Sequence, residues 1–379
     1  MTINNLTRRG LMGAFGVAAA AALAPSQILA QDKPKIKLGF IGPVSGGNAM
    51  QGLGAQNGFL LAIDQANAGD YPYQVEGVTL DDAADPQTGV GAALKLVNDP
   101  EVVAAIGHWN SSVALATMPV FSRFQMPLIV WGAISPKITE LNLPEVTRVT
   151  PTLLTENKPL AAWAAGELGV KNVAIVADTS DYGTGNAGAF ETYFTEKGGV
   201  IASTDLLPVG TTDFRAVLTK IKGSGADAIY FGGVITEAGI LRKQQKELGL
   251  DIPMIGISGF YDPEFIALAG DAAEGTMVSY PAAQSNPKLV QMDADYAAHG
   301  FADPESPYTK YAYDATGILL AAIKDVGIDD KVALAAAIRA ISYDGVLGTT
   351  TFDENGQTQI PVEIEIKVVK GGQWVTKGM

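Results

Sequence analysis

Short apolar runs alternate with longer amphipathic stretches along most of the chain. The apolar run 36–41 precedes an alanine-rich stretch over 49–67, and the runs 78–81 and 102–107 precede similar stretches. Those stretches cover 86–98 and 111–124, and further apolar runs occupy 128–131, 173–177, 226–231 and 254–257. This alternation predicts an α/β protein with parallel sheets covered by helices on both faces.

Local signals refine the predicted elements. The run 173–176 is apolar at every position, as expected for a strand buried on both sides. Asp85 followed by Pro86 marks a helix start, because the carboxylate caps free backbone donors and proline needs none there. Segments 141–151 and 279–287 each hold two prolines and are predicted crossings between lobes. Residues 362–366 alternate before Gly371-Gly372, which predicts an added strand or hairpin.

The first thirty residues resemble an export signal. Arg8 and Arg9 stand before an apolar run of 13 residues, 11–23, and Ala30 supplies a small residue for cleavage. Because a helix needs about 20 apolar residues to cross a bilayer, a lasting membrane anchor is disfavoured. We therefore expect a twin-arginine signal over 1–30 and a mature chain that begins at Gln31 in the periplasm.

Composition excludes several classes of function. Removing residues 1–30 takes away two basic and no acidic residues, so the net charge falls from −14 to −16, which disfavours nucleic-acid and anionic-lipid partners. The chain has no cysteine, which excludes thiol catalysis, zinc thiolate sites and iron–sulfur clusters. His108 and His299 are its two histidines, so a multi-histidine metal centre is not expected.

Three motifs that suggest other chemistry have structural explanations. Gly183 to Gly188 matches a dinucleotide fingerprint, with Asp205 as a ribose-binding acid, but residues 178–182 separate it from the preceding strand. A glycine-rich helix start that allows close packing is favoured instead. The acids Asp81, Asp82 and Asp85 suggest a metal cluster, but a cap and a strand end explain them. His108 near Ser111 and Ser112 has no evident third partner, so catalysis is disfavoured.

The segment 107–112 carries a more specific signal, because an apolar strand ends where a helix begins with two hydroxyls. The helix dipole and free backbone donors meet there, so Ser111 and Ser112 are candidates for holding a carboxylate. Simple N-capping by either serine is the alternative. Trp109 and Trp131 follow neighbouring strands and are expected at the same sheet edge, where open parallel sheets bind ligands. Lobe packing is the competing explanation for both tryptophans.

The chain resembles the branched-chain amino-acid (leucine/isoleucine/valine) binding proteins of ABC transporters. The matching stretches lie in the family's order at 36–45 (IKLGFIGPVS), 81–86 (DDAADP), 96–100 (LVNDP), 106–112 (IGHWNSS), 181–185 (DYGTG), 230–233 (YFGG) and 352–356 (FDENG). The resemblance implies a type I periplasmic binding fold with two Rossmann-like lobes joined by a three-strand hinge. It places lobe 1 at 31–150 plus 280–350 and lobe 2 at 151–279 plus 351–379.

The resemblance transfers site residues one at a time. Ser111 stands where the family has its carboxylate-binding serine, and Tyr182 where a tyrosine of the second lobe closes over the ligand. Ile134 replaces the usual threonine, and Ser258 replaces the acid that pairs with the ligand ammonium. Val234 stands where a polar or aromatic contact is common. Ala84 and Asn110 occupy the two positions of the family's early disulfide, which this chain lacks.

These inferences predict a non-catalytic receptor whose ligand is a small carboxylate with an apolar or aromatic body. Backbone or hydroxyl groups of Ser111, Ser112 and Ala133 would hold the carboxylate. An α-amino acid is disfavoured as the ligand, because a buried ammonium without a counter-charge is costly. The predicted ligand-binding residues are Gln51, Trp109, Asn110, Ser111, Ser112, Trp131, Ala133, Ile134, Tyr182, Val234, Ser258 and Phe260.

The remaining expectations concern partners and alternatives. We expect ABC permease subunits in the inner membrane as partners, a monomeric receptor, and no cofactor or metal. Alternatives within the class are a hydrophobic amino-acid binder that uses another acid, with Glu237 the nearest candidate, and a binder of short amides or urea. A dinucleotide-dependent oxidoreductase is the alternative from another class.

Overall fold

The computed structural model describes residues 33–282 and 285–378. The predicted export signal lies outside these residues. Within them, none of the helices is both long and apolar enough to cross a bilayer.

Five parallel strands form the first sheet, in the order β2-β1-β3-β4-β5. The strands are β1 (Lys35–Gly42), β2 (Gln74–Asp81), β3 (Val102–Gly107), β4 (Leu128–Val130) and β5 (Val146–Arg148). The intervening helices are α1 (Ala49–Ala68), α2 (Pro86–Asn98), α3 (Ser111–Arg123) and α4 (Lys137–Glu140). Two later helices join them, α11 (Thr309–Val326) and α12 (Lys331–Ala340).

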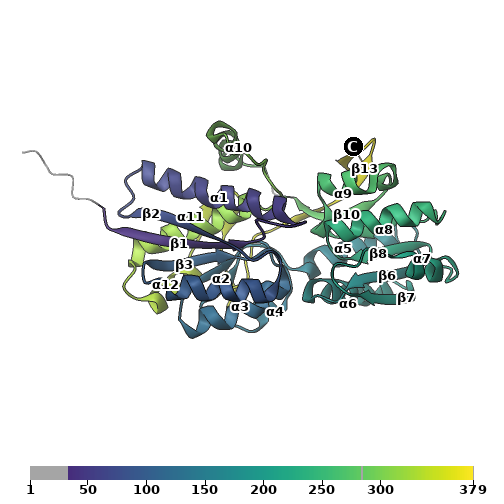
Figure 1. The fold of residues 1–379 in the computed structure, drawn as a ribbon, viewed down its shortest axis with the longest axis horizontal. Coiled ribbons are helices and arrows are strands. Elements are labelled where there is room, and N and C mark those ends of the chain that lie inside the picture. The colour runs from purple at the N-terminus through teal and green to yellow at the C-terminus, as the bar shows by residue number, and fades with distance from the viewer. Residues whose placement is uncertain (1–32, 283–284, 379) are drawn as a thin grey trace, which may run out of the picture. The chain divides into compact units, whose positions relative to one another are not determined.

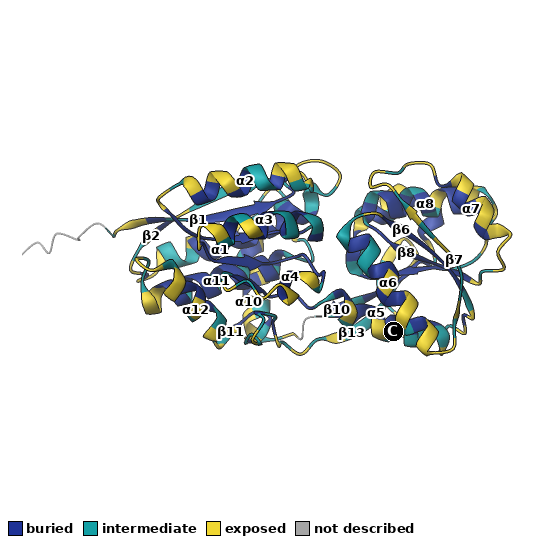
Figure 2. Cartoon of the chain, turned by 90° about the horizontal axis from the view of Figure 1, so that it is seen from below, coloured by how far each residue is buried: buried dark blue, intermediate teal, exposed yellow. Residues whose placement is uncertain are grey.

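Both faces of the first sheet are buried by helices. On one face, Phe40 of β1 packs in a core with Phe59 of α1 and Ile318 of α11. On the other face, Ile41 packs with α2 and α3, where Met118 is fully buried. Figure 2 shows the inner strands as buried and the outer helix faces as exposed, while the edge strand β2 is mostly of intermediate burial. This pattern follows from strand geometry, since successive side chains point to opposite faces.

Seven strands form the second sheet, in the order β14-β13-β10-β9-β8-β6-β7. The parallel part contains β6 (Asn172–Asp178), β7 (Val200–Leu207), β8 (Ala228–Gly232), β9 (Met254–Gly256) and β10 (Met277–Ala282). An antiparallel hairpin of β13 (Glu363–Lys370) and β14 (Gln373–Thr376) extends it beside β10. The predicted α/β class is therefore confirmed, as is the added hairpin near the end of the chain.

Helices also cover both faces of the second sheet (Figure 1). One face packs against α5 (Leu153–Ala165) and α6 (Asp181–Glu196), and the other against α7 (Arg215–Lys222), α8 (Ile235–Glu247) and α9 (Pro263–Ala269). The remaining elements are short turns of 3-10 helix at η1 (Ser258–Phe260) and η2 (Gly270–Ala273), helix α10 (Pro287–His299), and the pair β11 (Tyr343–Gly345) and β12 (Gly348–Thr350).

The chain passes between the two sheets three times, after β5, after β10 and after β12. Strand β10 pairs with β13 as far as Ala282, although the predicted first lobe resumes at residue 280. The division into lobes stays a prediction.

Two local predictions meet the structure directly. Asp85 caps α2, and its carboxylate accepts a hydrogen bond from the Thr88 backbone nitrogen at 2.7 Å. The run Gly183 to Gly188 lies inside α6, which begins at Asp181 with Ser180 as its cap. A Cβ on Gly183 would stand 2.3 Å from Asp178 Oδ1, so close packing against the end of β6 explains this glycine. The turn from β6 to α6 consists of Thr179 and Ser180, so the glycines lie inside the helix and not in the strand-to-helix turn that holds a dinucleotide.

Candidate functional site

Two adjoining pockets bring together residues from both sheets. The first is lined by Trp109, Asn110, Ser111, Gly132, Ile134, Tyr182, Val234, Gly259 and Tyr308. The second is lined by Ile134, Thr150, Pro151, Glu156, Ser258, Tyr280, Pro281, Pro307, Tyr308 and Tyr311. Ile134 and Tyr308 belong to both linings, so we treat the two pockets as one candidate site.

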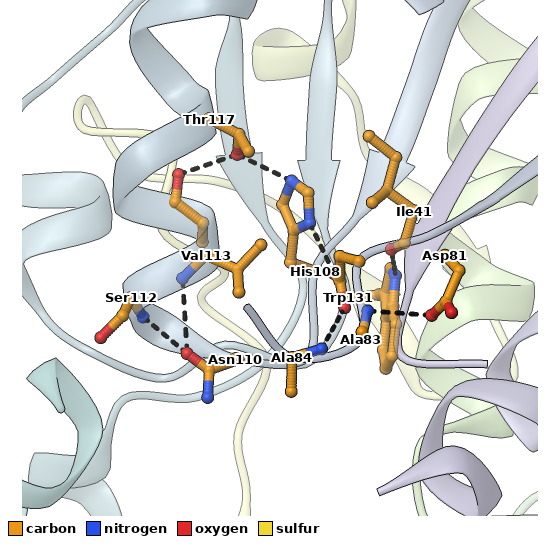
Figure 3. Close-up of polar contacts among 12 residues, drawn as sticks. Ile41, Asp81, Ala83, Ala84, His108, Asn110, Ser112, Val113, Thr117 and Trp131 are labelled. Carbon is orange, nitrogen blue, oxygen red and sulfur yellow. Dashed lines mark hydrogen bonds and ion pairs between the residues drawn. The ribbon is translucent and has the colours of Figure 1, made fainter. Parts of the chain in front are cut away.

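The start of α3 supplies the polar end of the first pocket. Asn110 caps the helix, and its side-chain oxygen accepts hydrogen bonds from the backbone nitrogens of Ser112 at 2.9 Å and Val113 at 3.3 Å (Figure 3). Ser111 Oγ accepts a hydrogen bond from the Ser135 backbone nitrogen at 3.2 Å. Because an accepting hydroxyl keeps its own hydrogen, Ser111 retains a donor for a ligand in the pocket that it lines.

A buried polar network centred on His108 holds this helix start in place. His108 Nδ1 lies 3.1 Å from Asp82 Oδ2, and His108 Nε2 lies 2.7 Å from Thr117 Oγ1, with all three side chains buried. Figure 3 shows the contact between His108 and Thr117, which lies above Asn110 and Val113 in that view. The sequence predicts no third partner for His108. The structure supplies two, and neither is Ser111 or Ser112. None of the three residues lines the pockets, so the network positions β3 and α3 relative to the loop after β2.

Ser112 does not take the predicted carboxylate-binding position. Its backbone nitrogen donates to the Asn110 cap, and its hydroxyl accepts from the Asp181 backbone nitrogen at 2.9 Å. The same hydroxyl donates to Asp181 Oδ2 at 3.1 Å, while Lys137 Nζ lies 2.8 Å from Asp181 Oδ1. Both hydrogen-bond donors of Ser112 are therefore already engaged, one with the Asn110 cap and one with Asp181 at the start of α6. The helix cap is Asn110, the residue before the serines, and not Ser111 or Ser112 as the N-capping alternative has it.

Ala133 and Trp131 lie behind the pocket rather than in its lining. The Ala133 backbone nitrogen donates to the His108 carbonyl at 2.9 Å, so it has no hydrogen left for a ligand. Trp131 is fully buried, stacks on Phe40 at 5.6 Å between ring centroids, and donates its indole N–H to the Ile41 carbonyl at 3.3 Å. Lobe packing, the competing explanation, therefore describes Trp131 better than contact with a ligand.

Phe260, Gln51 and Glu237 also lie outside both linings. Phe260 is fully buried in the core of the second sheet beside Phe265. The Gln51 side-chain amide donates to Asp262. Glu237, the acid suggested for an amino-acid ligand, accepts from the Gly210 backbone nitrogen at 2.9 Å and contributes to neither pocket.

The structure places the other predicted site residues in the linings. Trp109, Asn110, Ser111, Ile134, Tyr182 and Val234 line the first pocket, and Ser258 lines the second. Tyr182 reaches from α6, and its hydroxyl would stand 1.9 Å from a Cβ placed on Gly259. Glycine at 259 is therefore what allows this tyrosine its position at the site.

Glu156 is the most consequential residue that the sequence analysis missed. It lies in the first turn of α5, is 1% exposed, and lines the second pocket. The Ser258 backbone nitrogen donates to its Oε2 at 2.9 Å, and Ser258 Oγ lies 3.0 Å from its Oε1. Burial raises the pKa of Glu156 to about 7, against the opposing effect of these two hydrogen bonds.

Three tyrosines line the second pocket and were also missed. Tyr308, Tyr311 and Tyr280 approach Glu156 from the start of α11 and from β10. The Tyr308 ring meets Trp109 edge-on, with 6.3 Å between centroids. Burial, followed by the nearby carboxyl of Glu156, raises the pKa of each of Tyr308, Tyr311 and Tyr182 above its ordinary range. These hydroxyls therefore stay protonated and act as neutral hydrogen-bonding groups.

Neither pocket has the composition of a metal site. Among residues 33–282 and 285–378, no group of three or more histidine, cysteine, aspartate or glutamate side chains could hold a metal ion. The lining is aromatic and aliphatic, with a few hydroxyls and one buried carboxyl. Such a mostly apolar cavity with a few polar anchors is typical of a site for a small organic molecule.

The two helix-covered sheets and the pocket lined from both define a small-molecule binding protein of the type I periplasmic class. The sequence model of the family described as periplasmic binding protein matches residues 35–365, so the chain belongs to this family.

Relatives with stated ligands share the fold over most of their length. The chain is 32% identical over 324 residues to the leucine-, isoleucine-, valine-, threonine-, and alanine-binding protein of Pseudomonas aeruginosa, covering 85% of this chain and 86% of the relative. It is 26% identical, with a TM-score of 0.79, to the substrate binding protein LivJ of Streptococcus pneumoniae in complex with isoleucine, covering 90% and 99%. A solute binding protein of Rhodopseudomonas palustris in complex with 3,4-dihydroxybenzoic acid is 27% identical, with a TM-score of 0.78, covering 90% and 95%.

Proposed function

We propose that this protein is the solute-binding receptor of an ABC importer and takes a small carboxylate with an apolar or aromatic body. Ser111 at the start of α3 is the observation that carries the proposal. A helix of 13 residues directs its positive end and a free hydroxyl donor into a pocket. The lining residues of the two pockets include no lysine, arginine or histidine, so this helix start is the part of the site best suited to an anion.

The rest of the lining suits an apolar body. Trp109, Ile134 and Val234 surround the space beside Ser111, and Tyr182 lies across it from α6. The ligands named for the two solved relatives above, isoleucine and 3,4-dihydroxybenzoic acid, each join a carboxylate to an apolar or aromatic body. A carboxylate held at α3 is the feature that both kinds of ligand share.

The proposed receptor binds and releases its ligand without catalysis. Its partners are permease subunits in the inner membrane, and its location is the periplasm after export directed by residues 1–30. Two lobes built on the two sheets close on the ligand, whose contacts with both sides favour the closed state.

A hydrophobic α-amino acid is a second candidate ligand, and Glu156 is the observation that favours it. A buried carboxylate in the lining is able to pair with a ligand ammonium, although Ser258 already contacts both of its oxygens. This candidate predicts that removing the ammonium weakens binding.

Matched ligand pairs separate the two candidates. We expect 4-methyl-2-oxopentanoate to bind more tightly than leucine, and phenylpyruvate more tightly than phenylalanine, because the lining offers a donor for the carboxylate and no free anion for the ammonium. If the missing counter-charge is worth about 1.4 kcal/mol, the preference is about tenfold. Isothermal titration calorimetry on the mature chain measures it. Tighter binding of the amino acid in both pairs would establish the second candidate.

The Ser111→Ala variant tests the carboxylate contact itself. We expect it to weaken phenylpyruvate binding by roughly 1–3 kcal/mol, since a charged acceptor loses a donor. Ser122→Ala, at the far end of the same helix and outside both linings, is the matched control and should bind as the wild type does. Equal affinities of all three proteins would place the carboxylate elsewhere.

A further inference from the structure

Glu156 and Ser258 form a pair that the proposed carboxylate contact does not use. Glu156 lies in α5, while Ser258 begins the turn η1, 102 residues later in the chain. The Ser258 backbone nitrogen donates to one carboxyl oxygen at 2.9 Å, and the Ser258 hydroxyl contacts the other at 3.0 Å. Both residues line the second pocket, so the pair meets whatever ligand atoms reach it.

Glu156 has no counter-charge within the described part of the protein. The titratable groups around Glu156 are tyrosines, and the charge of its carboxyl helps to raise the pKa of each. They are Tyr182 of α6, Tyr230 of β8, Tyr280 of β10, and Tyr308 and Tyr311 at α11. On its own helix, Lys158 is exposed. An ionised carboxylate buried without a cation is costly, and a neutral carboxyl avoids that cost.

Two lysines lie on the Tyr280 ring that lines the same pocket. The Lys310 and Lys367 nitrogens stand 5.6 Å and 5.9 Å from its centroid. Neither lysine lowers the pKa of Glu156, and burial raises that pKa to about 7. The carboxyl therefore changes protonation near neutral pH, where a ligand is able to shift the balance.

The hydrogen bonds of the pair differ between its two protonation states. When Glu156 is ionised, the Ser258 hydroxyl donates to it and offers the pocket only lone pairs. When Glu156 is protonated, the carboxyl donates to the Ser258 hydroxyl, whose own hydrogen is then free. Tyr308, the tyrosine shared by both linings, makes a side-chain hydrogen bond with Ser258, so this hydrogen is available to the Tyr308 oxygen or to a ligand oxygen that takes its place. The protonated pair therefore suits a ligand oxygen, and the ionised pair suits a ligand ammonium.

We infer that Glu156 is a specificity-determining residue that holds a proton in the complex, so that the Glu156–Ser258 pair donates a hydrogen bond to an oxygen of the ligand. This inference rests on the proposed function, because it takes the ligand to be an anion that lacks an ammonium. It adds that binding is coupled to the uptake of a proton by the protein, and that keto, hydroxyl or carboxylate oxygens are what the second pocket recognises.

Proton coupling predicts how affinity depends on pH. A ligand that requires protonated Glu156 binds less tightly as the pH rises above the pKa of the free protein, by up to tenfold per pH unit for one proton. For 4-methyl-2-oxopentanoate, whose own carboxylate stays ionised, we expect nearly constant affinity at pH 5–6 and a loss of roughly tenfold between pH 8 and 9. A ligand ammonium paired with Glu156 reverses this sign, because its binding favours the ionised carboxyl.

The test is calorimetry with 4-methyl-2-oxopentanoate at pH 5 to 9, in buffers of different ionisation enthalpy that reveal the protons exchanged. We expect the wild type to take up close to one proton per ligand at pH 8. Glu156→Gln keeps the size and the donor but cannot ionise, so it should show little proton uptake, a flat pH profile, and affinity at pH 8 about tenfold above the wild type. Glu237→Gln, a buried acid outside both linings, is the control and should retain the uptake.

Failure of this inference differs from failure of the proposed function. If the acid binds without proton uptake, or if Glu156→Gln keeps the wild-type pH profile, the role of Glu156 is overturned while the acid-binding receptor stands. Leucine could instead bind more tightly than the acid, with a proton released by the wild type and not by Glu156→Gln. In that case the inference and the proposed function are both overturned, and Glu156 is the partner of the ammonium.

Discussion

Replacing Trp131 by alanine is expected to lower the free energy of unfolding by about 3–5 kcal/mol, the range found for large buried aromatic side chains. Trp131 is fully buried, stacks on Phe40 at an interplanar angle of 15°, and meets the Tyr308 ring edge-on at 5.9 Å. Alanine leaves a cavity under the candidate site and removes the hydrogen bond to the Ile41 carbonyl. Urea unfolding of the ligand-free protein measures the loss.

Trp163→Ala provides the matched control for that measurement. Trp163 lies on α5 and is partly exposed, with Lys377 above its ring at 4.4 Å. Its removal creates less of a cavity, so the loss should be clearly smaller. Equal losses of unfolding free energy in the two variants would contradict a core role for Trp131. Contact with a ligand would then be the better explanation for this tryptophan.

Replacing Glu156 by glutamine is expected to stabilise the ligand-free protein at high pH by about 3 kcal/mol. Burial raises the pKa of this carboxyl from the ordinary 4.5 to about 7, so the folded state resists its ionisation. The wild type therefore loses stability as the pH rises from about 4.5 to 7, whereas glutamine carries no such penalty. The two proteins should have similar stabilities near pH 4 and differ fully at pH 8.

Unfolding curves of both proteins at several pH values check this expectation. The control is Glu196→Gln, which makes the same change at an exposed position on α6. Its free energy of unfolding should stay close to that of the wild type at every pH. A wild type more stable than Glu156→Gln at pH 8 would mean that the ionised carboxylate is favoured in the fold. In that case a cation or further donors must reach it.

Most of the fold could be predicted because its signals are local. Strands such as β6 have an apolar run at their centre, 173–177, and helix starts such as Asp85-Pro86 need only the residues beside them. The same holds for part of the site, since Ser111 begins a helix and only three residues separate it from the end of a buried strand. The N-cap of α3 could not be assigned from the sequence, because Asn110, Ser111 and Ser112 are all good caps and the structure uses Asn110.

The rest of the site depends on contacts that are distant along the chain. Glu156 reads as an ordinary acid in the first turn of a helix until Ser258, 102 residues later, is placed against it. Tyr308 follows a proline and carries no pattern that links it to Trp109, nearly 200 positions earlier, although their rings are in contact. Trp131 illustrates a different gap, because a strand end indicates an edge of the sheet but not which way the side chain points.

The first sheet also determines how much of the chain must exist before it can fold. Its five strands end at Arg148, yet the helices α11 and α12 that cover one face lie between Thr309 and Ala340. Apolar residues of that face, such as Leu38 and Ile106, pack with Ile318 and Leu334. A nascent or truncated chain that stops before α11 leaves this face open to water and to other chains. Complete burial of the first sheet therefore requires α11 and α12, and a chain that lacks them exposes an apolar surface of the kind that promotes aggregation.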